Sequence, residues 1–321
     1  MTEQLIAGPV GLVFPGQGSQ FVGMATQLAA ASPAARAIIA EADDLLGFSL
    51  SGLMSDGPAE TLEDTINAQP AILTASVAAL AAIRERMAER DLALDPAMAA
   101  GHSLGEFSAL VAAGSLDFPA ALRLVRERGR LMKEAGDRAP GGMAAVLGLD
   151  DDQLADVCRE ASRDGVIVIA NANCPGQTVI SGEVTALETA MALARERGAK
   201  RALRLGVSIA AHSSLMADAN RQFGDAIATS PINDPAFPVL SNATVQPLST
   251  AAEVRQELLG HMEGPVLWTQ TVQAMQAAGV TTLVEIGPGA VLAGLIKRID
   301  RDLAVRGIGD LGLDLPVDTG K

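Results

Sequence analysis

A serine flanked by glycines carries the strongest chemical signal in this 321-residue sequence. Gly101-His102-Ser103-Leu104-Gly105 has the G-x-S-x-G pattern and joins a short apolar segment, 97–101, to a helical pattern that begins at Glu106. In such a strand-to-helix turn the glycines relieve crowding, and the serine hydroxyl lies near helix N-terminal N–H groups that can hold an oxyanion. The pattern therefore predicts Ser103 as a nucleophile, with an ordinary glycine-rich turn as the alternative.

Three histidines are available as the base that a nucleophilic serine needs. His102 is adjacent to the serine, and because successive side chains in a tight turn diverge, we expect it to pack beneath the turn. His261 lies in a helical pattern and is the weaker candidate. His212 stands where the chain returns from a small inserted region to the main body, so we predict it as the base. The alternative is a structural histidine.

Arg128 is the most informative charged residue, because it lies on the apolar face of the helix predicted at 118–135. Its face is shared by Ala121, Leu124, Val125, Leu131 and Met132, whereas Arg123, Arg126, Arg130 and Lys133 point the other way. A buried guanidinium needs an anionic partner. An internal carboxylate and the carboxylate of a substrate, held by a bidentate clamp, are equally compatible with this pattern.

Charge and composition narrow the classes of partner and cofactor. The formal net charge of -14 disfavours nucleic acid and anionic membranes as partners. Cys158 and Cys174 have no metal-ligand spacing, so we expect no metal site and two idle thiols in a reducing cytoplasm. The loop at 16–20 lacks both the phosphate-binding Gly-Lys-Ser/Thr and the third glycine of the dinucleotide pattern, so we expect no nucleotide site.

We also expect no targeting or membrane-spanning segment. The N-terminus lacks a basic region followed by an apolar core, and the longest apolar-rich stretch, 71–83, is too short to span a bilayer. We therefore predict a cytoplasmic protein in which residues 71–83 form a buried helix.

The elements that must position these residues alternate between short apolar strands and helical patterns. Strands are predicted at 10–14, 97–101, 238–240 and 282–286, with helices between them, as in an α/β body. The stretch 141–205 differs, since it reads strand, helix, strand, strand, helix, strand, the ferredoxin-like order. The predicted division is an α/β body at 1–138 and 208–306, a ferredoxin-like βαββαβ subdomain at 139–207, and a flexible tail at 307–321.

Eight motifs, in order from about Val10 to Ile299, together resemble one family. The chain is similar to the malonyl-CoA:acyl carrier protein transacylases, which include the acyltransferase domains of fatty-acid and polyketide synthases. The matching segments are 14–20, Gln69-Pro70-Ala71, 101–106, Arg128-Gly129, Asn173-Cys174-Pro175-Gly176-Gln177, 212–216, Pro265-Val266-Leu267-Trp268 and Glu285-Ile286-Gly287-Pro288-Gly289.

The resemblance implies roles for particular residues and a hydrolase-like α/β body with a short parallel sheet. It makes Ser103 the nucleophile and His212 the base, and it places the oxyanion hole at the backbone N–H groups of Gln17 and Leu104. It makes Arg128 the clamp for the free carboxylate of a malonyl group. In the family a backbone carbonyl orients the histidine, from a position that usually holds glutamine and here holds His261.

The implied reaction moves a malonyl or similar dicarboxylic acyl group from coenzyme A to the phosphopantetheine thiol of an acyl carrier protein, through an acyl-serine. Coenzyme A thioester is then a substrate, and no bound cofactor is expected. The segment 209–211 matches neither tetrapeptide typical of malonyl- or methylmalonyl-selective polyketide relatives. The rival functions are a serine esterase or thioesterase with the same turn and an inactive carrier-binding scaffold. The sequence is compatible with a monomer.

A carrier protein is acidic, as is this chain, so docking requires a local basic surface. One segment offers Arg195, Arg197, Lys200, Arg201 and Arg204 with only Glu196 opposing, and another offers Lys297, Arg298 and Arg301. The first segment is the predicted docking patch, at Arg195, Arg197, Lys200 and Arg201. The alternative is that both segments are ordinary solvated surfaces, since helix C-termini favour cations.

Overall fold

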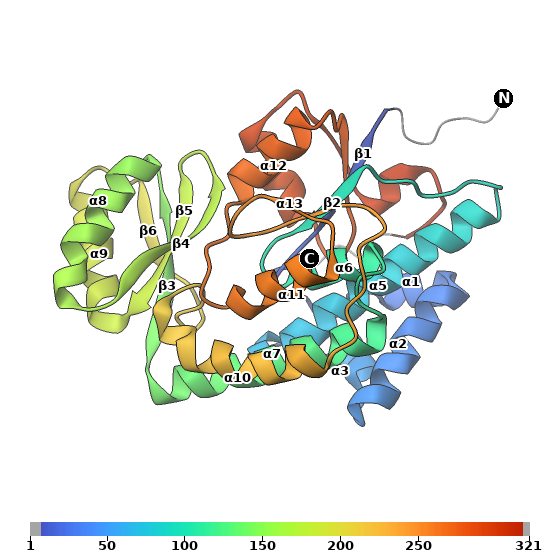
Figure 1. Cartoon of the computed structure of the whole chain (residues 1–321), viewed down its shortest axis with the longest axis horizontal. Helices are drawn as coiled ribbons and strands as arrows, with labels where there is room; N and C mark the ends of the chain where they lie inside the picture. The colour runs from blue at the N-terminus through green and yellow to red at the C-terminus, as the bar shows by residue number, and fades with distance from the viewer. Residues whose placement is uncertain (1–7, 317–321) are drawn as a thin grey trace.

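Two β-sheets organise the computed structural model, which describes residues 8–316 (Figure 1). The larger sheet has the strand order β10-β9-β1-β2-β7-β8, and all neighbours except β7 and β8 run parallel. Its strands are β1 Val10–Phe14, β2 Met98–Gly101, β7 Val239–Leu240, β8 Pro247–Leu248, β9 Thr282–Glu285 and β10 Ala304–Arg306. Because the carboxyl ends of parallel strands meet at one edge, the segments that follow β1, β2 and β7 can converge there.

Burial explains the composition of the central strands. Every residue of β1 is buried, and its sequence Val-Gly-Leu-Val-Phe does not alternate with polar residues. A strand covered on both faces by helices reads as a continuous apolar run of this kind. The body helices are α1 Thr26–Ala31, α2 Pro33–Leu46, α3 Leu50–Asp56, α4 Ala59–Glu63, α5 Thr65–Ala88, α6 Gly105–Ala112, α7 Phe118–Arg138, α10 Ala217–Thr229, α11 Ala251–Gly260, α12 Trp268–Ala277 and α13 Val291–Ile299.

Helix α5 is longer than the buried helix predicted at 71–83, because it spans 24 residues. By length and composition it could cross a membrane, yet 83% of its most apolar window is buried inside the protein. It packs against α2 and α7 in the interior of the body. Its apolar character is therefore accounted for by the core.

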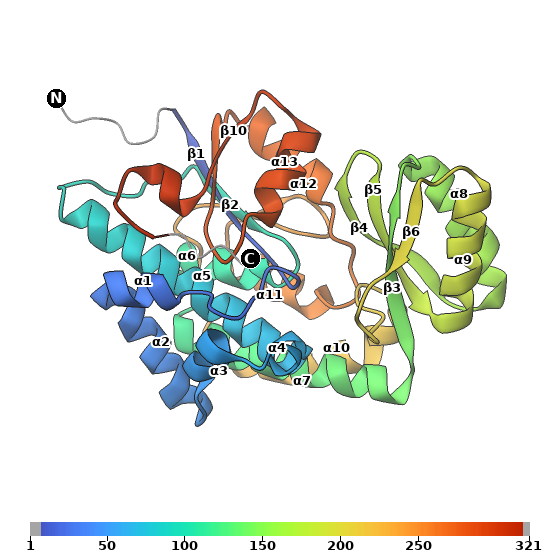
Figure 2. The same cartoon turned by 180° about the vertical axis from the view of Figure 1, so that it is seen from behind.

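The smaller sheet is antiparallel throughout, with the order β4-β5-β3-β6. Its elements are β3 Gly141–Leu147, α8 Asp151–Ala161, β4 Ile167–Cys174, β5 Gln177–Glu183, α9 Val184–Glu196 and β6 Arg201–Arg204, so the βαββαβ order is present. Helices α8 and α9 cover the outer face, and the strands lie toward the body (Figures 1 and 2). The predicted fold class, a hydrolase-like α/β body with a ferredoxin-like insert, is confirmed.

The chain beyond β10 packs on the body for as far as the structure describes it, contrary to the flexible tail predicted at 307–321. A short 3-10 helix, Ile308–Leu311, follows β10, and Leu313 and Leu315 are buried after it. Their apolar side chains join the main hydrophobic cluster. The free energy gained by burying them holds this segment on the body despite the glycine and aspartate residues around them. Residues 317–321 of that prediction lie outside the described range, as do residues 1–7, where we expected no signal peptide.

Candidate active site

Ser103 occupies a strained turn between β2 and α6. Its backbone φ is 49°, in the left-handed region that a residue with a side chain rarely adopts. The flanking glycines leave no room for a Cβ: at Gly101 it would lie 1.9 Å from the carbonyl carbon of Gly105, and at Gly105 it would lie 2.1 Å from the carbonyl oxygen of Phe14. The G-x-S-x-G pattern is therefore required by this packing as well as by the turn.

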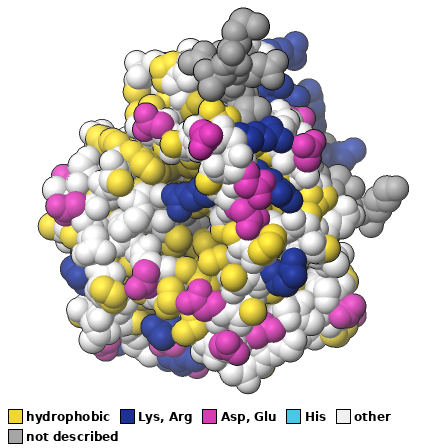
Figure 3. Space-filling view, turned by 90° about the vertical axis from the view of Figure 1, so that its right-hand side faces the viewer, with side chains coloured by type: hydrophobic (Ala, Val, Ile, Leu, Met, Phe, Trp, Pro, Cys, Tyr) yellow, Lys and Arg dark blue, Asp and Glu magenta, His cyan; other side chains and the backbone are white. Residues whose placement is uncertain are grey.

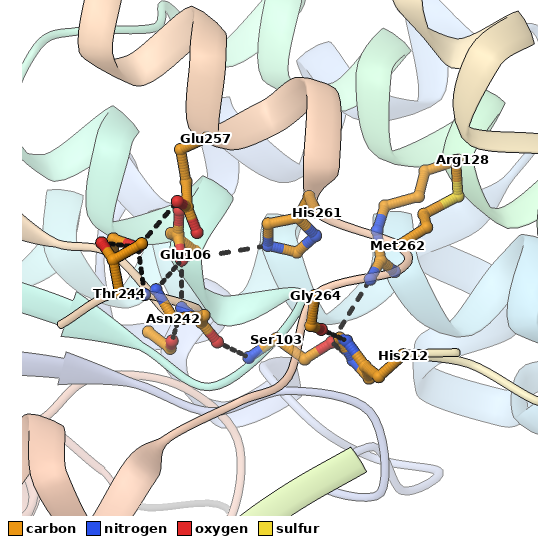
Figure 4. Close-up of polar contacts among 12 residues, drawn as sticks. Ser103, Glu106, Arg128, His212, Asn242, Thr244, Glu257, His261, Met262 and Gly264 are labelled. Atoms are coloured by element: carbon orange, nitrogen blue, oxygen red, sulfur yellow. Dashed lines mark hydrogen bonds and ion pairs between the residues drawn. The ribbon is translucent and has the colours of Figure 1, made fainter. Parts of the chain in front are cut away.

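His212 lies beside the serine hydroxyl (Figure 4). The distance between Ser103 Oγ and His212 Nε2 is 2.8 Å, and His212 Nδ1 lies 2.7 Å from the carbonyl oxygen of Gly264. A carbonyl oxygen can only accept, so Nδ1 carries the proton and Nε2 is free to accept one from the hydroxyl. This geometry can turn a serine into a nucleophile.

The carbonyl that holds the imidazole belongs to Gly264 and not to His261, which corrects the position inferred from the family. Helix α11 ends at Gly260, and a turn closed by a hydrogen bond from Gly264 N to Gly260 O brings the Gly264 carbonyl to His212. The side chain of His261 is buried instead against the ring of Phe107, at a centroid distance of 5.2 Å. One helical turn of chain separates the two positions.

Burial keeps His212 uncharged. The side chain is 4% exposed, and desolvation followed by the nearby charge of Arg128 lowers its pKa to about 3. Both effects disfavour the imidazolium. At neutral pH, His212 can therefore accept a proton without first losing one.

Arg128 is a buried cation with no carboxylate at salt-bridge distance within residues 8–316. It is 2% exposed. Its Nη1 donates to Gln69 Oε1 at 2.9 Å, its Nη2 donates to Ser103 Oγ at 3.3 Å, and its Nε has no partner there. Burial lowers its pKa to about 10, so it stays charged at neutral pH. The internal salt bridge, one of the two alternatives for this residue, is therefore not formed among the described residues.

A chain of hydrogen bonds connects Arg128 to the loop after β1. Gln69 Nε2 donates to Thr65 Oγ1 at 3.0 Å, and Thr65 Oγ1 donates to Gln17 Oε1 at 2.9 Å. The loop is pressed against the serine turn, since a Cβ on Gly16 would lie 2.2 Å from the carbonyl oxygen of His102. This contact brings Gln17 to the same edge of the sheet as the nucleophile.

The backbone N–H groups of Gln17 and Leu104 differ from that of Ser103 in their availability. Leu104 immediately precedes α6, and neither it nor Gln17 donates a backbone N–H hydrogen bond to any described residue. The Ser103 N–H donates to Asn242 Oδ1 at 2.8 Å. These two N–H groups, in the loop after β1 and in the serine turn, therefore remain available for a developing oxyanion.

The inserted subdomain also reaches the site, through a contact that sequence reasoning missed. Strand β4 extends as far as Cys174, and Asn173 Oδ1 near its end lies 2.8 Å from His102 Nε2. The segment Asn173-Cys174-Pro175-Gly176-Gln177 was the available signal, because the family motif includes it. His102 is thus occupied by Asn173 and, as predicted, is turned away from the role of base.

Strand β4 is also joined to the chain that follows the histidine-holding carbonyl. Ala172 N donates to Val266 O at 2.9 Å, and Val266 N donates to Ala170 O at 2.8 Å. Val266 lies two residues beyond Gly264. The insert and the base are therefore positioned by one continuous segment.

The residues of the predicted docking patch fall into two groups. Arg195 donates to the carbonyl of Ala202, and Arg197 is paired with Glu160. Lys200 and Arg201 are exposed and have no side-chain partner among residues 8–316. They precede and begin β6, an edge strand whose Leu203 is 50% exposed.

The free pair lies at the end of the small sheet that approaches the serine. Lys200 N donates to Leu147 O, and Gly148 N donates to Gly176 O, in the turn that follows Asn173. At that turn Arg298 of α13 bonds to Gln177.

A different face of the molecule, on the side of α1 and α2, has acidic and basic side chains interspersed around an apolar hollow (Figure 3).

Among residues 8–316, no group of three or more His, Cys, Asp or Glu side chains could hold a metal ion. Cys158 and Cys174 are free and buried. Burial raises the pKa of the Cys158 thiol to about 12, so this thiol stays protonated.

The chain is similar to known proteins over nearly its whole length. The model of the acyl transferase domain family matches residues 12–306. The chain is 43% identical to the malonyl CoA-acyl carrier protein transacylase of Bacillus subtilis over 94% of this chain and 93% of the relative. It is 46% identical to the Escherichia coli K12 protein of the same description, over 89% and 91%.

Two solved structures extend the likeness to three dimensions. The acyl carrier protein S-malonyltransferase of Vibrio cholerae aligns with a TM-score of 0.87 at 42% identity, over 93% of this chain and 96% of that one. A malonyl-transacylase in complex with its type II PKS acyl-carrier protein aligns with a TM-score of 0.90 at 41% identity, over 96% and 99%.

Proposed function

The chain belongs to the acyl transferase domain family, and from that premise we propose that it transfers a malonyl group from coenzyme A to the phosphopantetheine thiol of an acyl carrier protein. The observation that carries this function is Arg128, a buried cation without a carboxylate partner among residues 8–316, whose Nη2 is 3.3 Å from Ser103 Oγ. A buried charge of this kind needs an anion, and a dicarboxylic acyl group supplies one beside its reacting carbonyl.

In the first step, His212 Nε2 takes the proton of Ser103 as Oγ attacks the thioester carbonyl. The backbone N–H groups of Gln17 and Leu104 hold the oxyanion. When the oxyanion collapses, the carbon–sulfur bond breaks and the thiol of coenzyme A leaves with the proton from His212. The product is a malonyl ester of Ser103.

The second step reverses these roles. His212 takes the proton of the carrier's phosphopantetheine thiol, whose sulfur attacks the ester carbonyl. Collapse breaks the bond to Ser103 Oγ, and His212 returns the proton to that oxygen. Coenzyme A thioester is thus a substrate, and the proposed reaction uses no resident cofactor or metal.

Arg128 is the proposed selectivity residue. The guanidinium presents a fork of N–H donors that suits a carboxylate, and its unpartnered Nε is one such donor. An acyl group without a carboxylate would leave the buried cation unpaired. The proposed donor class is therefore malonyl or a similar dicarboxylic acyl group.

The two rival functions fit these observations less well. A serine esterase or thioesterase has no use for an unpaired buried arginine beside the nucleophile, and it usually orients the histidine with a carboxylate, whereas His212 meets the carbonyl of Gly264. An inactive carrier-binding scaffold needs no hydrogen bond between Ser103 and His212.

Carrier docking is proposed at Lys200 and Arg201, the unpaired members of the basic segment. Arg195 and Arg197 were expected to contribute, but they are occupied by Ala202 and Glu160, which supports a secondary role for them. Electrostatic attraction to an acidic carrier would raise the encounter rate.

We further propose a cytoplasmic location. We also propose a division into a body, at 1–138 and 208–306, and a subdomain, at 139–207. A separate hydrophobic cluster in the subdomain supports this division.

The proposed function is tested by intact-mass spectrometry after incubation with malonyl-CoA. The native chain should gain one malonyl group, and Ser103→Ala should gain none while it keeps the native unfolding temperature. Addition of a phosphopantetheinylated acyl carrier should move the group to the carrier faster than water removes it. Rapid hydrolysis without a carrier would indicate a thioesterase, and carrier binding without any labelling would indicate a scaffold.

A further inference from the structure

Asn242 follows β7 and bonds to the serine turn on both sides of His102 (Figure 4). Its Oδ1 accepts from Ser103 N at 2.8 Å, and its Nδ2 donates to Gly101 O at 2.8 Å. One amide group therefore holds the backbone of the nucleophile and the end of β2 together.

The carboxyl group of Glu106 holds Asn242 in turn. Glu106 is fully buried in the first turn of α6, and its Oε2 accepts from the backbone N of Asn242 at 3.0 Å and also from Nδ2. The orientation of the amide is fixed, because a flipped group would direct its oxygen at the acceptor Gly101 O and its Nδ2 at the donor Ser103 N–H. Oδ1 must therefore face Ser103.

His261 closes this buried unit on the side of the base. Its Nε2 lies 3.9 Å from Glu106 Oε2, and neither ring nitrogen has a hydrogen-bond partner in the described chain. Burial, followed by the charge of Glu257, raises the pKa of Glu106 well above its usual range, and burial lowers that of His261 well below its own. Both shifts favour the uncharged forms, so a protonated carboxyl and a neutral imidazole can lie side by side in this buried unit.

We propose that Asn242 is a positioning residue for the nucleophile, held in place by Glu106. It keeps Ser103 in the left-handed conformation that directs Oγ toward His212 Nε2. By occupying the Ser103 N–H, it also leaves Leu104 and Gln17 as the oxyanion donors. The inference rests on the proposed function for its substrate, but the reactivity of Ser103 can be measured without one.

The first test compares Asn242→Ala with Thr244→Ala. Thr244 lies in the same segment and bonds to Ser241 Oγ, but no hydrogen bond joins it to residues 101–105. We expect Asn242→Ala to slow acylation by malonyl-CoA about 100-fold, as displaced reacting groups do, with KM within about twofold of native. KM should hold because Arg128, the proposed clamp for the carboxylate, is hydrogen-bonded to Gln69 and Ser103 and not to Asn242. Thr244→Ala should match the native chain.

The second test is a rescue that a purely structural role would not give. Asn242→Asp replaces the amide donor with a carboxylate oxygen, so Gly101 O loses its hydrogen bond and acylation should slow. Adding Glu106→Gln supplies an amide N–H that can hold one carboxylate oxygen while the other accepts from Ser103 N, so the double variant should recover at least about a tenth of native activity. This comparison still decides the matter if Asn242→Ala fails to fold.

A fluorophosphonate that labels reactive serines separates this inference from the proposed function. If the native chain reacts with the probe and Asn242→Ala reacts at least about 50-fold more slowly, the positioning role holds whatever the natural substrate. Equal probe rates for the two proteins, or failure of the double variant to exceed Asn242→Asp, would overturn it. Absence of malonyl labelling on a native chain that reacts with the probe would overturn the proposed function alone.

Discussion

Arg128 and the pair Lys200 and Arg201 are all cations without a carboxylate partner among the residues described, yet they lie in opposite environments. Arg128 is 2% exposed beside Ser103, whereas Lys200 and Arg201 are exposed at the edge of the inserted sheet. Water satisfies the surface pair at little cost, whereas Arg128 is almost completely removed from solvent. The buried cation should therefore control which acyl group reacts, and the surface pair should control only how fast a partner arrives.

The largest expected effect is the loss of donor selectivity in Arg128→Ala. Removing one partner of a buried ion pair costs about 3–5 kcal/mol, so kcat/KM for malonyl-CoA should fall about 10²–10⁴-fold. Acetyl-CoA, which has no carboxylate, should lose little or gain. Arg123→Ala is the matched control, because Arg123 lies on the exposed face of α7. Equal losses of kcat/KM for malonyl-CoA and acetyl-CoA would indicate that the role of Arg128 is structural.

A second effect concerns the pH dependence of acylation. His212 acts as a base only when neutral, and its pKa of about 3 keeps it neutral above that pH. The single-turnover rate with malonyl-CoA should therefore be flat between pH 5 and pH 8, with no limb at the usual histidine range near about 6.5. A rate that falls with acid around that value in the native chain would contradict the low pKa.

The charge of Arg128 is the second cause of that low pKa, which gives a linked test. In Arg128→Ala the imidazolium is no longer repelled, so the pKa of His212 rises. The acid limb of acylation by acetyl-CoA should accordingly move to higher pH in this variant than in the native chain. If the acid limbs of the two proteins coincide, the charge of Arg128 does not affect the pKa of His212.

Charge reversal on the surface should have a smaller effect. Lys200→Glu/Arg201→Glu should raise KM for the acyl carrier about 10-fold at low salt, weaken its salt dependence, and leave loading of Ser103 by malonyl-CoA unchanged. Arg163→Glu is the control, because Arg163 precedes β4 at the other end of the small sheet. If carrier KM and its salt dependence both stay at their native values, Lys200 and Arg201 are ordinary solvent-exposed residues with no part in docking.

The smallest effect is expected at Leu203, the exposed apolar residue next to this pair. Leu203→Ser should change the free energy of unfolding by no more than about 0.5 kcal/mol, since the side chain is half exposed. If the carrier covers the edge of β6, carrier KM should still rise about threefold, because an apolar contact is lost. An unchanged carrier KM would indicate that the carrier contacts the charged pair and not Leu203.

Local sequence rules were sufficient for the features that depend on residues close together in the chain. The serine turn could be predicted because the two glycines and the start of α6 lie within a few positions of Ser103. The burial of Arg128 could be predicted because a helix repeats its faces every 3–4 residues, which set it among apolar neighbours on α7. The βαββαβ order of the insert also followed from local periodicity.

Contacts between segments that follow different strands depend on tertiary packing. Asn242 is 139 residues from Ser103, and His212 is 109 residues from it, so no local pattern relates them. The carbonyl at Gly264, rather than at His261, is presented by a turn after α11 whose direction depends on the packing of that helix. The extension of β4 to Asn173 depends likewise on its pairing with Val266.

The sequence by itself therefore determined the nucleophile turn, the candidate base, the buried arginine and the order of elements. Only the tertiary structure decided that Arg128 has no carboxylate partner within residues 8–316, that Lys200 and Arg201 are free while Arg195 and Arg197 are not, and that the chain packs on the body as far as Leu315. The physical reason is that backbone geometry propagates along a few residues, whereas pairing and burial depend on which distant side chains the folded chain brings together.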